Sequence, residues 1–192
     1  MGIRFIARLA VVVVGLLAAG CGSPTQQATD ATKGSSAVVV PLQLASWEET
    51  RELVAQHQGK VVVLDIWSTW CQPCLAEFPN LVQLQQRHPE QVVCMSLNCN
   101  YTGVKDEPPE HARAEIEKFL QQQGANFPNI ICTDTDEALF TDLDLGSIPA
   151  VLVFDESGKL HKRFDNDAAE YGDEGFRYEQ HIIPLVEQLL QP

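Results

Sequence analysis

The feature that most constrains the fold is a pair of cysteines, Cys71 and Cys74, placed just after an apolar run at residues 61–66. The run predicts a buried strand, and the sequence after the pair predicts a helix with Pro73 in its first turn. At such a strand-to-helix turn, the unpaired N–H groups and the positive dipole end of the helix favour a thiolate over a thiol. Since the thiolate is the nucleophile of disulfide exchange, the pattern predicts redox chemistry. Half of a zinc site and a structural disulfide are the alternatives.

Strand-like and helix-like segments alternate in the first half of the chain, and a hairpin and a terminal helix follow. This order favours an α/β fold with a central mixed sheet covered by helices on both faces. Ser46 and Glu49 predict a capping box at the start of the first helix. Strands are expected at residues 38–44, 61–67, 92–98, 127–132, 150–154 and 159–164, and helices at residues 46–56, 73–87, 112–123, 136–143 and 182–190.

The segment WSTWCQPCLAEFP at residues 67–79 resembles the active site of the thioredoxin superfamily. It is most similar to the membrane-tethered TlpA/ResA-like thiol–disulfide oxidoreductases, and the resemblance extends from about residue 38 to the C-terminus. It implies a thioredoxin fold with an αβ insertion, at about residues 100–132, after the third strand. It also implies a protein-disulfide oxidoreductase, for which we predict no cofactor. The matching residues are Trp67, Trp70, Cys71, Pro73, Cys74, Glu77 and Pro79.

The two active-site cysteines are expected to have different roles. Cys71 comes first, at the helix start, and is predicted to be the more exposed, attacking thiolate. Cys74 lies one turn into the helix and is predicted to be the resolving thiol, which attacks the mixed disulfide. Gln72 and Pro73 between them differ from the Gly-Pro of thioredoxin and the Pro-His of strong oxidants, which favours reduction as the direction of the reaction.

Asp65 lies six residues before Cys71, inside an otherwise apolar strand. A buried carboxylate destabilises the fold unless it has a partner or a function. Thioredoxins carry a buried Asp at the matching place, implicated in proton transfer with the second cysteine, so the resemblance implies this catalytic role. Burial is expected to raise its pKa toward the working range. The alternative is a carboxylate that is hydrogen-bonded at the end of a sheet, and many TlpA-like proteins have Asn here.

Glu77 lies three residues after Cys74, one helical turn further on the same side. In ResA-like proteins the matching Glu tunes the cysteine pKa values and the choice of substrate, and an exposed helical Glu is the alternative. Ile148 and Pro149 precede a predicted strand, at the place where the superfamily has a cis-proline beside the dithiol. The resemblance therefore implies a substrate groove lined by Trp70, Ile148 and Pro149.

Three cysteines remain besides this pair and the N-terminal Cys21. Cys94 lies within a strand-like run and is predicted to be a small buried hydrophobe. Cys99 and Cys132 each end a strand, and if those strands are parallel neighbours a second disulfide is an alternative to two free thiols. A zinc site formed by these thiols and His111 is disfavoured because no second CxxC exists, so no metal site is predicted.

The first 20 residues resemble a bacterial lipoprotein signal, with two arginines, an apolar run and small residues before Cys21. The resemblance implies that Cys21 is lipidated and becomes the first mature residue, although Ala18 stands where the family usually has Leu. An ordinary cleaved signal peptide and an uncleaved anchor helix are the alternatives, and all three predict export. Residues 21–37 are predicted to be the lipidated cysteine with a flexible tether, and residues 38–192 the thioredoxin-like domain.

The chain carries a formal net charge of −13 and has no basic stripe, so nucleic acid is excluded as a partner. The predicted partners are a disulfide-containing protein substrate, a membrane-bound electron donor and the membrane itself, through the lipid anchor. The chain is expected on the extracytoplasmic side of a bacterial cell envelope, where it reduces protein disulfides in cytochrome c maturation, as TlpA/ResA-like proteins commonly do. The alternatives are a metal-binding or metal-delivery lipoprotein that uses the CxxC thiols, and a structural lipoprotein with a redox-inactive thioredoxin fold.

Overall fold

The structure is a computed structural model that describes residues 40–167 and 169–191. All of these residues belong to one compact unit. The predicted signal peptide, the lipidation site Cys21 and the tether therefore lie outside the described residues. Within the described part, no helix has both the length and the apolar character needed to cross a membrane.

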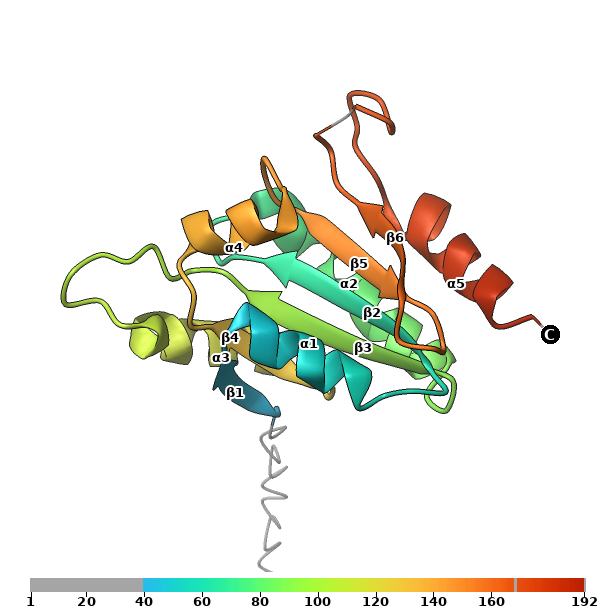
Figure 1. The fold of residues 1–192 in the computed structure, drawn as a ribbon, viewed down its shortest axis with the longest axis horizontal. Coiled ribbons are helices and arrows are strands. Elements are labelled where there is room, and N and C mark those ends of the chain that lie inside the picture. Colours follow the sequence, from blue (N-terminus) through green and yellow to red (C-terminus); the bar gives the residue numbers. More distant parts are fainter. Residues whose placement is uncertain (1–39, 168, 192) are drawn as a thin grey trace, which may run out of the picture. The chain divides into compact units, whose positions relative to one another are not determined.

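Six strands form one mixed sheet in the described part of the chain: β1 (Leu42–Ala45), β2 (Val61–Trp67), β3 (Val92–Asn98), β4 (Asn129–Cys132), β5 (Ala150–Phe154) and β6 (Leu160–Phe164). Their order in the sheet is β1-β4-β3-β2-β5-β6 (Figure 1). The central strand β2 pairs in parallel with β3 and antiparallel with β5, and β5 and β6 form the predicted hairpin. Every residue of β2 is buried, as expected for a strand covered on both faces. The predicted central mixed sheet is therefore confirmed.

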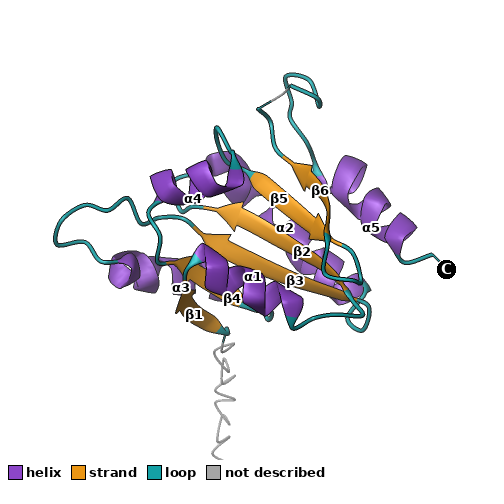
Figure 2. Cartoon of the chain, viewed as in Figure 1, coloured by secondary structure: helices purple, strands orange, loops and turns teal. Residues whose placement is uncertain are grey.

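The helical segments of the described residues are α1 (Trp47–Ala55), α2 (Gln72–Arg87), the 3₁₀ turn η1 (Pro109–Ala112), α3 (Arg113–Gln123), α4 (Asp136–Leu143), the π-helical turn η2 (Tyr178–Ile182) and α5 (Ile183–Leu189). They cover both faces of the sheet (Figure 2). Because side chains alternate along a strand, β2 contributes to two separate cores. Val63 and Trp67 pack with α2, α3, η2 and α5, whereas Leu64 and Ile66 pack with α1 and α4.

The predicted αβ insertion consists of η1, α3 and β4, and it adds a strand to the interior of the sheet. β4 lies between β1 and β3 and runs parallel to both. Its first residue, Asn129, is buried, and its side-chain amide donates to the carbonyls of Phe127 at 2.7 Å and Ala125 at 3.0 Å. Its Oδ1 accepts a bond of 2.7 Å from the hydroxyl of Ser96 in β3. The strand begins two residues later than predicted, and Pro128 before it has no N–H to contribute to a sheet.

Most of the predicted element boundaries hold, and the capping box at α1 is present. The hydroxyl of Ser46 accepts from the N–H of Glu49 at 3.2 Å, and the Glu49 carboxylate accepts from the N–H of Ser46 at 2.8 Å. The last helical region starts earlier than predicted, at Tyr178, because a π-helical turn precedes α5. Pro184 lies in the first turn of α5, directly after the π-helical turn, and has no N–H to donate to a preceding helical carbonyl.

Candidate active site

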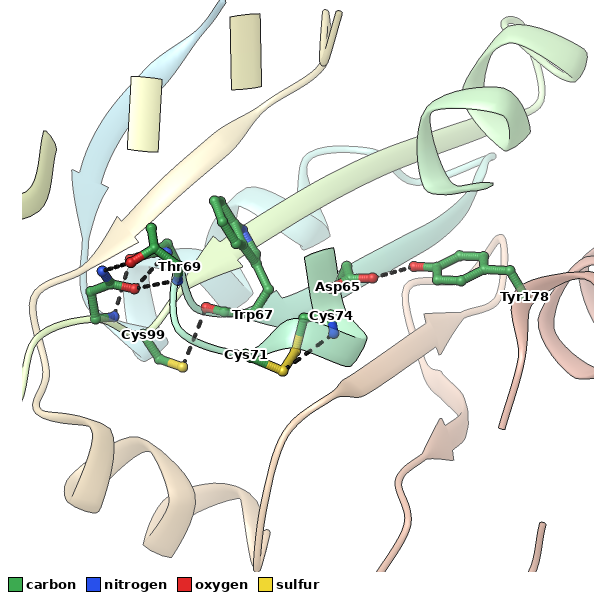
Figure 3. The surroundings of a disulfide bond; sticks show 9 residues. Asp65, Trp67, Thr69, Cys71, Cys74, Cys99 and Tyr178 are labelled. Atoms are coloured by element: carbon green, nitrogen blue, oxygen red, sulfur yellow. Dashed lines mark hydrogen bonds between the residues drawn. A yellow bond between two sulfur atoms is a disulfide. The ribbon is translucent and has the colours of Figure 1, made fainter. Parts of the chain in front are cut away.

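The predicted cysteine pair lies at the N-terminus of α2, just after the central strand β2 (Figure 3). Cys71 is the N-cap residue, and a disulfide joins it to Cys74 with the Cα atoms 5.3 Å apart. The N–H of Cys74 donates to Cys71 Sγ at 3.3 Å. The first sulfur therefore occupies the place at which a helix stabilises negative charge. In this oxidised state both cysteines are buried. Cys71 is 5% exposed and Cys74 is 2% exposed, so Cys71 is only slightly the more exposed of the two.

The turn between β2 and α2 is held by the loop that follows β3. Asn100 accepts from the N–H of Thr69 at 3.0 Å and donates to its hydroxyl at 2.8 Å. The N–H of Cys99 donates to the carbonyl of Trp67 at 2.9 Å. These bonds fix the backbone just before the dithiol, whereas Trp70 is 56% exposed. The ring of Trp70 is therefore open to contact with another molecule.

The peptide bond between Ile148 and Pro149 is cis, as predicted. It lies directly before β5, whose first residue, Ala150, pairs with Ile66 near the end of β2. The sheet therefore brings the cis-proline to the end of β2 that carries the dithiol. Ile148 is half-buried and packs against both cores.

Asp65 is only 3% exposed, and it shares its face of β2 with Val63 and Trp67, the face covered by α2. Its Oδ2 accepts a hydrogen bond from the hydroxyl of Tyr178 at 2.5 Å, and its Oδ1 has no partner (Figure 3). Burial raises the pKa of Asp65 to about 7, against the lowering effect of the Tyr178 bond and with the help of the nearby charge of Glu77. The carboxyl is thus both hydrogen-bonded and able to change protonation near neutral pH.

Glu77 is bound through both of its oxygens, and its side chain is 17% exposed. Oε1 pairs with Arg177 at 3.3 Å. Oε2 accepts from the N–H of Tyr178 at 3.2 Å and from the side chain of Asn80 at 3.1 Å. Glu77 therefore ties α2 to the C-terminal segment instead of pointing freely into solvent.

Cys94, Cys99 and Cys132 are free and fully buried. The second disulfide considered for Cys99 and Cys132 is therefore not formed. The thiol of Cys99 donates to the carbonyl of Trp67 instead, with an S–O distance of 3.4 Å. Burial raises the pKa of Cys99 and of Cys132 to about 12, so neither is a thiolate at neutral pH. Within residues 40–167 and 169–191, no group of three or more His, Cys, Asp or Glu side chains could hold a metal ion.

Three residues that reach the site carry no local signal in the sequence: Asn100, Arg177 and Tyr178. Asn100 lies in a polar loop, and it is 31 residues away in the sequence from its partner Thr69. Arg177 and Tyr178 follow an acidic, Gly-containing stretch and contact residues about 100 positions earlier. A basic and an aromatic residue side by side, between an acidic loop and a helix, are the only clue.

A Cys-x-x-Cys disulfide at the start of a helix, beside a cis-proline on a mixed sheet, defines the class of protein. It is a thioredoxin-like thiol–disulfide oxidoreductase. Solved structures agree on the fold: a thiol:disulfide interchange protein of the thioredoxin family from Chlorobium tepidum superposes with a TM-score of 0.54 at 20% identity, over 71% of this chain and 84% of that chain.

The model of the redoxin family matches residues 19–175, so the chain belongs to the redoxin family. The thiol-disulfide oxidoreductase ResA of Geobacillus kaustophilus is 29% identical over 161 residues, which cover 82% of this chain and 84% of the relative. The thiol:disulfide interchange protein HelX of Rhodobacter capsulatus is 25% identical over 114 residues, 59% of this chain and 57% of the relative. The predicted resemblance to TlpA/ResA-like proteins is confirmed.

Proposed function

We propose that this chain reduces disulfide bonds of proteins outside the cytoplasm, with Cys71 and Cys74 as the electron-donating dithiol. One observation carries the proposal. The pair lies at the N-terminus of α2 beside the cis-proline, with the ionisable Asp65 buried on the face of β2 that α2 covers. This combination supplies a nucleophile, a place for a substrate chain and a group that accepts a proton.

The proposed reaction has two steps. First, the Cys71 thiolate attacks a sulfur of the substrate disulfide, a mixed disulfide forms, and the other substrate sulfur leaves as a thiolate. Second, Cys74 passes its proton to Asp65 and attacks Cys71 Sγ, so that the Cys71–Cys74 disulfide closes. The second substrate sulfur then leaves as a thiolate and takes up a proton. Two electrons have passed to the substrate, and a membrane-bound dithiol donor restores the reduced enzyme.

The electrostatic environments of Cys71 and Asp65 support these roles. The helix N-terminus stabilises a thiolate at Cys71, which is the attacking form. A carboxyl with a pKa of about 7, such as Asp65, accepts and returns a proton efficiently near neutral pH. Glu77 contributes through its charge, which acts on Asp65. In this proposal Trp70, Ile148 and Pro149 line the groove that holds the substrate chain.

The proposed location and pathway have separate support in the sequence. Small residues before Cys21 support a lipid anchor on the extracytoplasmic face of a bacterial membrane. The Gln72-Pro73 pair supports reduction over oxidation. A place in cytochrome c maturation is supported by the resemblance to TlpA/ResA-like proteins.

Reduction of insulin by the purified protein, driven by dithiothreitol, tests the proposed function. Cys71→Ser should abolish the catalysed reduction, and Cys74→Ser should accumulate mixed disulfides with the substrate, visible on non-reducing gels. Cys132→Ser, which removes a buried free thiol, is the matched control and should retain activity. Trapping by Cys71→Ser instead would reverse the two roles, and activity in the absence of both thiols would refute the proposal.

The direction of electron flow is tested by the reduction potential of the Cys71–Cys74 pair in glutathione or dithiothreitol buffers. A potential near that of thioredoxin, about −270 mV, supports a reductant. A potential near that of DsbA, about −120 mV, would make the protein an oxidant.

A further inference from the structure

Tyr178 connects the two carboxyl groups of the active site although it lies far from both in the sequence. Its hydroxyl donates to Asp65, 113 residues away, and its backbone N–H donates to Glu77, 101 residues away. Figure 3 shows the tyrosine ring reaching from the C-terminal segment to Asp65 in β2. One residue therefore contacts Asp65 and Glu77 by two different groups.

The position of Tyr178 is fixed by its surroundings. It is fully buried and packs in the same core as Cys74, Ile182 and Val186. It begins the π-helical turn η2, a form of helix that is rare and occurs frequently at functional sites. Before it, the side chain of Arg177 pairs with Glu77.

Only one of the two carboxyl oxygens of Asp65 has a hydrogen-bond partner. Oδ2 is occupied by the tyrosine hydroxyl, whereas Oδ1 is buried without any hydrogen-bond partner. A buried acceptor without a partner is rare, and it calls for an explanation. The lack of a partner is explained if Oδ1 receives a proton during turnover. Protonation of Oδ1 leaves the Tyr178 hydrogen bond to Oδ2 in place.

We propose that Tyr178 is a positioning residue of the redox site: its hydroxyl holds one oxygen of Asp65 so that the other oxygen receives the proton of Cys74. This inference rests on the proposed function, in which Cys74 must lose a proton before it attacks the mixed disulfide. The proton moves from the Cys74 thiol to Asp65 Oδ1, which leaves a Cys74 thiolate and a neutral carboxyl. No other atom changes its bonding in this step.

The titratable groups around Asp65 fix the direction of the expected effect. They are Tyr178 from η2, Glu77 and Cys74 from α2, Cys94 from β3 and Cys99 just after β3, and none of them is cationic. The cationic Arg177 pairs with Glu77. The tyrosine hydroxyl is therefore the group that stabilises the Asp65 carboxylate. Its removal should raise the pKa of Asp65 further, so that less of the carboxylate base is present at neutral pH.

Tyr178→Phe removes only the hydroxyl and keeps both the ring and the N–H that binds Glu77. Tyr171→Phe is the matched control, because Tyr171 lies in the same C-terminal segment and its hydroxyl faces Lys162 and Glu170. Carbon-13 NMR titration of the Asp65 carboxyl should show a midpoint raised by about one pH unit or more in Tyr178→Phe and unchanged in Tyr171→Phe. This readout does not depend on turnover.

The kinetic test uses the rate at which Cys74 resolves a preformed mixed disulfide, followed from pH 6 to pH 9. Tyr178→Phe should move the pH profile upward, and it should have no further effect in the Asp65→Asn background. An unchanged Asp65 titration and pH profile, whether or not the unfolding midpoint falls, would overturn the inference.

A second measurement needs no variant. In the wild-type protein the Tyr178 Cζ resonance should titrate with the same midpoint as Asp65, and a flat response would overturn the inference. The proposed function fails separately, if the wild-type protein does not reduce insulin. The two NMR titrations would still decide whether Tyr178 and Asp65 are coupled.

Discussion

The carboxylate of Asp167 accepts a hydrogen bond of 2.6 Å from the backbone N–H of Gly146, and this contact joins the loop after β6 to the turn that leads into the cis-proline. Asp167 is itself held, because its N–H donates to Asp165 at 3.0 Å. Asp165 in turn pairs with Arg163 at 2.6 Å, and the guanidinium of Arg163 also donates to the carbonyl of Leu143. The end of β6 therefore supports the cis-proline turn by a chain of charged contacts.

Asp167→Ala should loosen this turn and weaken substrate binding. We expect the KM for a protein disulfide to rise about three- to tenfold, as for the loss of one charge-assisted hydrogen bond at an exposed site, with a smaller change in kcat. Gly146→Ala should act similarly, since an added Cβ would lie 2.9 Å from Asp167 Oδ1. Asp173→Ala changes an exposed carboxylate of the same loop and serves as the control. A fall in kcat at constant KM would contradict this role.

Asp65→Asn should slow turnover most strongly near neutral pH. The substitution keeps the shape of the side chain and removes the group that we propose accepts the proton of Cys74. General acid–base catalysis typically contributes about 10²-fold or more, so we expect a loss of that order in the Cys74-dependent step. Stopped-flow rates between pH 6 and pH 9 measure it. An unchanged rate across this range would leave Asp65 with a packing role only.

The same variant should make the oxidised protein increasingly more stable than the wild type as the pH rises from 4 to 8. The pKa of Asp65 is raised from 3.8 to about 7 in the folded state. Between these values the folded protein holds a proton that the unfolded chain has released, so the free energy of unfolding of the wild type falls as the pH rises. Asn does not ionise, so the variant avoids this loss of unfolding free energy, which is roughly 4 kcal/mol for three pKa units. Urea unfolding at pH 4, 6 and 8 measures the difference, and a difference that does not change with pH would contradict the raised pKa.

The buried cysteines should be unreactive in the native, reduced protein. At pH 8 a thiol with a pKa of about 12, such as Cys99 or Cys132, is a thiolate in only about one molecule in 10⁴. Iodoacetamide should therefore label Cys71 first and leave Cys94, Cys99 and Cys132 unmodified, as judged by peptide mass spectrometry. Labelling in urea is the control, in which all of them should react. Rapid native labelling of Cys132 would show that β4 opens.

Cys21→Ala should release the protein from the membrane into the soluble extracytoplasmic fraction, since the proposed anchor is a lipid on this residue. The purified variant should reduce insulin at the wild-type rate. Ser23→Ala, two residues further along, is the control and should remain with the membrane. Retention of Cys21→Ala in the membrane pellet would show that a different element anchors the chain.

The strand, the dithiol turn and the first active-site helix could be predicted because their determinants are local. An apolar run, two thiols and Pro73 lie within a short stretch, and the structure places β2 and α2 within one residue of the predicted bounds. The cis-proline could be predicted for a related reason, because two adjacent residues before a strand, Ile148 and Pro149, indicate it. Asp65 could be predicted as buried, because a single carboxylate interrupts an apolar strand.

The remainder of the site depends on contacts that no local pattern encodes. Parallel pairing has no turn to reveal it, so the position of β4 between β1 and β3 could not be read from the chain. The bond between Tyr178 and Asp65 depends on how the last helical region packs, and a π-helical turn has no simple sequence signature. The burial of Cys71 in the disulfide form likewise depends on the packing around it.

The wide separation between Asp65 and Tyr178 has a consequence for biosynthesis. A ribosome makes the chain from its N-terminus, so both redox cysteines emerge long before the tyrosine does. Tyr178 is the first of the last fifteen residues to be added, so until then Asp65 lacks its hydroxyl partner. A nascent or C-terminally truncated chain therefore carries the complete dithiol motif and Asp65, but lacks the tyrosine hydroxyl that binds this carboxyl in the folded domain.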